Sequence, residues 1–203
     1  MNHFRKISVA ILAVYLLGLL GGCAAALVPS TSDPARKLGW AQELMDNKNR
    51  PLPAEKLVNE AIEIYTVQQN ELGLAEAYRV YGLFFKSYAV ASQQRHYEES
   101  GFLDKSATYA KRFEKSLEYF EKSRDLLQKN GDLDSLPNVY VQIGITYTFM
   151  NNSIAACNSY DASLKAHQSR MEQDPKLKYE LPKEFSDFSD AVVHLKKKSG
   201  CQL

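Results

Sequence analysis

The sequence has no excess of charge of either sign. Its 25 Lys and Arg residues are nearly balanced by 24 Asp and Glu residues, which gives a net charge of +1. A nucleic-acid-binding protein usually carries a basic stripe, so this balance gives no reason to expect a nucleic-acid partner. Hydrophobic residues make up 45% of the 203-residue chain and charged residues 24%, which excludes a disordered or collagen-like protein.

The sequence also lacks the short motifs that carry catalysis or bind cofactors. It has no His-Glu-x-x-His or Cys-x-x-Cys zinc pattern, no Gly-x-Ser-x-Gly nucleophile turn, and no Gly-rich loop for a phosphate or a dinucleotide. The four histidines are scattered at positions 3, 96, 167 and 194. We therefore expect no metal, no cofactor and no enzymatic activity.

Strand signals are absent as well. No alternation of Val, Ile or Thr lasts more than a few residues, and no Asn-Gly turn separates two apolar runs. Apolar residues recur at helical spacing over most of the chain beyond Asp33. The sequence therefore predicts an all-α protein.

The longest apolar run, residues 7–20, is too short to span a membrane, because a spanning helix needs about 20 residues. Arg5 and Lys6 precede the run, which gives this segment the order of a secretory signal peptide. The run ends in Leu20-Gly21-Gly22-Cys23, which resembles the lipobox of bacterial lipoproteins. The alternative is an uncleaved N-terminal anchor in which Cys23 has no special role.

The lipobox resemblance implies a domain organisation and a location. Residues 1–22 would be removed, Cys23 would carry the lipid, and residues 23–32 would tether it to a domain at 33–203. Because Ala24 rather than Asp follows Cys23, the resemblance implies an outer-membrane anchor that faces the periplasm. Two or more acyl chains would make the anchor stable.

Lipidation of Cys23 would leave two cysteines, Cys157 and Cys201. An even pair in an oxidising compartment favours a disulfide. If the last helix runs antiparallel to the helix that carries Cys157, its end returns to the level of that cysteine. The alternative is two unpaired thiols.

Capping residues, prolines and glycines divide residues 33–203 into helices. We expect them at 34–47, 53–69, 72–99, 104–130, 136–151 and 153–171, with a last one that contains Phe185, Phe188, Val192 and Leu195. About 22 residues, from Ser87 to Tyr109, are expected to extend two helices into a long hairpin, and the alternative is that they form a loop. The aromatic residues in and beside this segment either pack between those helices or lie exposed on a groove (Phe84, Tyr88, Tyr97, Phe102 and Tyr109).

Two helices share one pattern of an aromatic, an apolar residue, Gly and an aromatic, at positions 78, 81, 82 and 85 and again at 140, 143, 144 and 147. The second copy continues with Ala156, Tyr160 and Ser163 on the next helix. This series resembles the tetratricopeptide repeat (TPR). Gln168 stands where the repeat usually has its closing Pro. Gly144 has no side chain, so it allows a neighbouring helix to approach closely.

The TPR resemblance implies a solenoid of about three helix pairs with a C-terminal capping helix. It implies a partner-binding face lined by the first helix of each pair, at Glu76, Arg79, Leu83 and Lys86 and at Asn138, Val141, Ile145 and Thr148. We expect a scaffold or assembly factor for pilus, secretion or outer-membrane assembly, with a protein or peptide partner and an undetermined oligomeric state. The alternatives are an immunity or inhibitory lipoprotein that binds a toxin, and an envelope enzyme acting on peptidoglycan.

Overall fold

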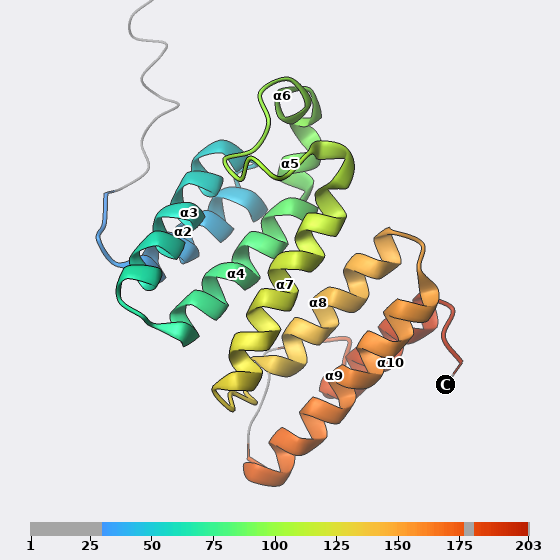
Figure 1. Cartoon of the computed structure of the whole chain (residues 1–203). Coiled ribbons are helices and arrows are strands. Elements are labelled where there is room, and N and C mark those ends of the chain that lie inside the picture. Colours follow the sequence, from blue (N-terminus) through green and yellow to red (C-terminus); the bar gives the residue numbers. More distant parts are fainter. Residues whose placement is uncertain (1–29, 177–180, 203) are drawn as a thin grey trace, which may run out of the picture. The chain divides into compact units, whose positions relative to one another are not determined.

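A computed structural model of the chain describes residues 30–176 and 181–202 (Figure 1). The predicted signal peptide, Cys23 and most of the tether lie outside these residues. The described helices belong to the unit formed by Ser32–Leu203, and no strand occurs among the described residues. The all-α prediction is therefore confirmed.

The long helices are α2 (Pro34–Asp46), α3 (Pro51–Val67), α4 (Glu71–Lys86), α7 (Arg112–Lys129), α8 (Leu136–Phe149), α9 (Ser153–Gln173) and α10 (Phe188–Lys198). Most of the long helices begin and end close to the predicted boundaries, but α4 ends well before the expected residue 99 and α7 begins after the expected residue 104. Asp33 caps α2, since its Oδ1 accepts a hydrogen bond from the Ala35 N–H at 2.9 Å. Gly131, with a φ of 66°, follows the end of α7 in the left-handed conformation that glycine adopts easily.

The long helices pack mainly in consecutive pairs. The closest pairs are α2 with α3, α4 with α7, and α8 with α9 (Figure 1). Contacts of α3 with α4 and of α7 with α8 join each pair to the next, and α10 packs on α9. A hydrophobic core formed by α4, α7, α8 and α9 joins the second and third pairs, and it includes Phe120, Val139 and Ile143.

The two glycines of the repeated pattern occupy equivalent places in the structure. A Cβ atom on Gly82 would lie 2.7 Å from the Phe120 ring, and one on Gly144 would lie 2.5 Å from the Tyr160 ring. In each case an aromatic ring from the second helix of a pair packs on the glycine of the first. The Ser116 hydroxyl donates to the Gly82 carbonyl at 2.7 Å, which strengthens this contact in the second pair.

The expected long hairpin between α4 and α7 is wrong. The segment instead folds into α5 (Tyr88–Ser92), α6 (Gln94–Glu99), a loop and the 3-10 turn η2 (Tyr109–Lys111). Ser87 ends α4 because its backbone is extended, and its hydroxyl accepts a hydrogen bond from the Val90 N–H. Folding back also buries an aromatic cluster in which the Tyr97 and Phe102 rings stack at 4.3 Å and both contact Phe84.

The C-terminal helix α10 is held by a disulfide and by apolar packing. Cys157 on α9 is joined to Cys201 beyond α10, with the two Cα atoms 5.6 Å apart, as the sequence led us to expect. Phe188 and Val192 of α10 are buried against Tyr160. None of the described helices is both long enough and apolar enough to cross a membrane.

Candidate functional site

A groove of about 590 Å³ lies between α2, α4 and α8, the first helix of each pair. We call it the α2–α4–α8 groove. Its lining combines apolar, amide and charged side chains from these helices and from the residues that follow α2 and α4: Gln42, Met45, Asp46, Asn47, Asn49, Leu83, Lys86, Ser87, Tyr88, Gln142, Ile145 and Phe149.

Three of the predicted partner-binding residues line this groove: Leu83 and Lys86 from α4, and Ile145 from α8. The contribution of α2, including Gln42 and Met45, was not predicted from the sequence. The first helix pair lacks the aromatic–apolar–Gly–aromatic pattern, so nothing in its sequence marked the equivalent positions.

Three other predicted residues do not line the groove. Glu76 and Arg79 form a two-bonded ion pair with each other along α4, with N–O distances of 2.6 and 2.7 Å. Asn138 is exposed near the start of α8, and its side-chain oxygen lies 3.5 Å from the Gln142 amide nitrogen.

The assignment of Val141 and Thr148 to an open binding face is wrong. Val141 is only 9% exposed and belongs to the apolar cluster that contains Phe188 and Val192 of α10. The Thr148 hydroxyl shares a hydrogen bond of 2.8 Å with the Ser199 hydroxyl. The C-terminal helix and the residue after it therefore take up the space that a partner would need at these positions.

Lys86 is the basic residue of the groove lining, and the groups that its side-chain nitrogen contacts are neutral. Its Nζ donates to the Gln142 side-chain oxygen at 2.7 Å and lies 5.2 Å from the centre of the Phe120 ring. Burial lowers the pKa of Lys86 to about 7, because desolvation disfavours the charged amine. Among the described residues, no carboxylate lies within ion-pair distance of this nitrogen.

Two exposed aromatic side chains stand at the groove. Tyr88 at the start of α5 is 79% exposed, and Phe149 at the end of α8 is 53% exposed. The Ser92 hydroxyl of α5 donates to the Asn49 side-chain oxygen at 2.9 Å. This bond ties residues 87–111, which we call the α4–α7 insertion, to the α2–α3 loop. The insertion therefore contributes to one wall of the groove.

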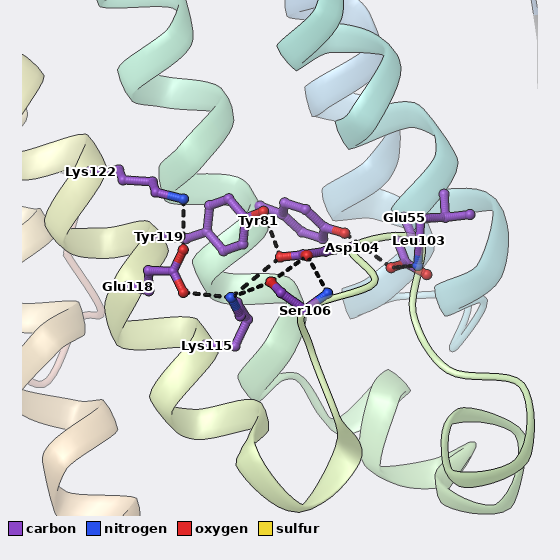
Figure 2. Close-up of polar contacts among 9 residues, drawn as sticks. All are labelled: Glu55, Tyr81, Leu103, Asp104, Ser106, Lys115, Glu118, Tyr119 and Lys122. Atoms are coloured by element: carbon purple, nitrogen blue, oxygen red, sulfur yellow. Dashed lines mark hydrogen bonds and ion pairs between the residues drawn. The ribbon is translucent and has the colours of Figure 1, made fainter.

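A buried carboxylate holds the insertion against the rest of the domain (Figure 2). Glu55 of α3 is 3% exposed and accepts hydrogen bonds from the Tyr81 hydroxyl at 3.0 Å and the Leu103 N–H at 2.7 Å. Desolvation raises the pKa of Glu55 to about 7, and these two hydrogen bonds oppose that shift. The sequence did carry a signal for this residue, since Glu55 shares an apolar helix face with Val58 and Tyr65.

A second group of polar contacts fixes the same loop to α7 (Figure 2). Asp104 accepts hydrogen bonds from the Tyr119 hydroxyl and the Ser106 N–H, both at 2.9 Å, and its carboxylate lies 3.5 Å from Lys115 Nζ. The hydrogen bonds to Asp104 help to lower its pKa against the opposing effect of burial. Together with Glu55, these contacts clamp residues 103–106 between α3 and α7.

The position of Glu55 argues for a structural role. A buried carboxylate with a pKa near 7 is the kind of group that acts in general acid–base catalysis. Glu55 does not line the α2–α4–α8 groove, and its hydrogen bonds position the loop at Leu103. No cluster of three or more His, Cys, Asp or Glu side chains suited to a metal ion occurs in residues 30–176 and 181–202.

Comparison of the chain with protein-family models, with curated proteins and with solved structures gives no match.

Proposed function

We propose that this protein is an outer-membrane-anchored lipoprotein that faces the periplasm and binds a segment of another protein, as a scaffold or assembly factor of the bacterial envelope. The observation that carries this proposal is the α2–α4–α8 groove, which takes side chains from the first helix of all three pairs. A TPR-like stack of helix pairs forms its inner face in this way. The lipobox-like Leu20–Cys23 segment supports the anchor.

The lining of the groove suits a peptide better than a reacting small molecule. Amide side chains, such as those of Asn49 and Gln142, both donate and accept hydrogen bonds, as the peptide backbone does. Leu83 and Ile145 provide apolar contacts for side chains of the bound segment. The carboxylate in the groove lining is that of Asp46, which is exposed. Glu55, whose pKa is strongly raised, does not line the groove. We therefore propose binding, without catalysis, as the activity of this site.

Site-specific photo-crosslinking in living cells tests this proposal. A photo-reactive amino acid is placed at Leu83 or Ile145 in the groove and, as a control, at the exposed Lys165 of α9. We expect the two groove positions to crosslink to the same envelope protein and the control position not to do so. Crosslinking from all three positions alike, or from none of them, would contradict a partner in this groove.

A further inference from the structure

We propose that the α2–α4–α8 groove recognises an acidic side chain, Asp or Glu, within a partner segment, and that the partner carboxylate pairs with Lys86. This inference rests on the proposed function and specifies the chemistry of the partner. Its central observation is a partly buried cation that the described part of the domain leaves without a counter-ion.

The surroundings of Lys86 explain why a carboxylate would bind there. A lysine ammonium has three N–H donors. Among residues 30–176 and 181–202, the hydrogen bonds of Lys86 go only to Gln142, whose side-chain oxygen is 2.7 Å away and whose carbonyl is 3.4 Å away. Asp46 also lines the groove, but it is exposed and forms no ion pair with Lys86. An anion that enters the groove would therefore find an available donor in a poorly hydrated place, where charge-assisted hydrogen bonds are strong.

The low pKa of Lys86 agrees with this geometry. With a pKa of about 7, a substantial fraction of the amine is neutral near neutral pH. An incoming carboxylate favours the protonated amine, so binding would raise this pKa and take up a proton.

The groove suits an acidic side chain better than the carboxylate at the end of a chain. Chain termini are captured in nests of backbone N–H groups. Here the C-terminal ends of α2, α4 and α8 lie at the groove, and helix C-termini present carbonyl groups. Recognition therefore depends on the side chain of Lys86, while the exposed Tyr88 and Phe149 are placed to contact apolar residues beside the acidic one.

Selection from a displayed library of random peptides on the folded domain tests this inference. Four proteins are compared: the native domain, Lys86→Met, Lys165→Met as a control that removes an exposed lysine of α9, and Ile145→Trp, which places a larger side chain in the groove. Thermal unfolding checks that each variant is folded. Peptides selected on the native domain are then synthesised with Glu or Gln at the acidic position and as C-terminal amides, and their affinities are measured by fluorescence polarisation.

We expect the selected peptides to carry an internal Asp or Glu next to apolar residues. The Glu form should bind about tenfold more tightly than the Gln form to the native domain and to Lys165→Met. Lys86→Met should lose this preference, and Ile145→Trp should weaken the binding of both the Glu and the Gln forms. Three outcomes would overturn the inference and leave the proposed function standing. The peptides could bind in the groove without an acidic residue, they could need a free C-terminal carboxylate, or they could keep their preference for Glu on Lys86→Met. If no peptide that binds in the groove is selected, the result contradicts both the inference and the proposed function.

Discussion

Gly144 and Gly39 lie in helices of the same domain but have very different surroundings. A Cβ atom on Gly144 would meet the Tyr160 ring at 2.5 Å, whereas one on Gly39 would have nothing within 4 Å. We predict that Gly144→Leu lowers the free energy of unfolding by about 1–3 kcal/mol or more, because the new side chain is forced between α8 and α9. Chemical denaturation measures this change.

Gly39→Leu is the matched control for this prediction. It adds the same side chain at an open helix position, where the higher helix propensity of Leu should stabilise the domain by up to about 1 kcal/mol. Equal stability of Gly144→Leu and the native protein would show that the packing of Tyr160 on Gly144 is not needed for the fold.

Glu55 gives the domain a pH-dependent stability. The pKa of Glu55 is about 7 in the folded protein. For the unfolded chain we take the ordinary carboxyl pKa of 4.5. Between these two values the folded state binds more protons, so the free energy of unfolding falls as the pH rises, by at most about 3 kcal/mol. Desolvation of the buried carboxylate is the main cause of the shift.

We predict that Glu55→Gln removes most of this pH dependence. Gln keeps an oxygen that can accept the Leu103 N–H but has no charge to desolvate. Urea denaturation of both proteins from pH 4.5 up to about pH 7 should show the native protein losing stability relative to the variant. Lys86 does not obscure the result. Its pKa is about 7 in the folded protein and ordinarily 10.5, so its effect on the free energy of unfolding varies mainly above pH 7. Parallel curves for the two proteins would refute the prediction.

At the level of elements, local sequence signals predicted the long helices well except for the end of α4 and the start of α7. Asp33 before Pro34 and Gly131 after α7 act within a few residues, so their effects can be read without the fold. The α4–α7 insertion could not be predicted in this way. Its path depends on contacts between distant positions, such as the packing of Phe84 on Phe102 and the hydrogen bond from Leu103 to Glu55.

The groove was predicted only in part, for a related physical reason. The repeated pattern marks the faces of α4 and α8, and Leu83, Lys86 and Ile145 do line the groove. The pattern does not show where a capping helix will dock, so it could not reveal that α10 buries Val141. Met45 of α2 was missed because its helix carries no repeat signature.

The disulfide leads to a prediction about α10. Cys157 and Cys201 are 44 residues apart in the sequence, and closing a loop of this size is worth about 4 kcal/mol in the chain-entropy model. We predict that reduction, or replacement of both cysteines by Ser, speeds amide hydrogen exchange in α10 and leaves exchange in α2 and α3 unchanged. Uniformly faster exchange would mean that the bond supports the whole domain. Unchanged exchange in α10 would mean that packing of Phe188 and Val192 is sufficient.

For the whole molecule, the proposed lipid anchor predicts how the protein is processed and where it is found. Replacing Cys23 by Ser removes the thiol that would carry the lipid, so the chain should stay unprocessed or lose its attachment to the outer membrane. Membrane fractionation and the apparent mass on gels measure both outcomes. A Cys23→Ser protein of mature size that still fractionates with the outer membrane would contradict the anchor.

The insertion between α4 and α7 has a consequence for the order in which the pairs fold. Three residues separate α8 from α9, whereas 25 residues, 87–111, separate α4 from α7. The conformational entropy lost on closing a loop increases with its length, and early contacts form between segments that are near in sequence. We expect the α8–α9 pair to form before the α4–α7 pair and to provide the surface on which α7 and then α4 assemble. Pulse-labelled hydrogen exchange during refolding should therefore protect the amides of α8 and α9 before those of α4.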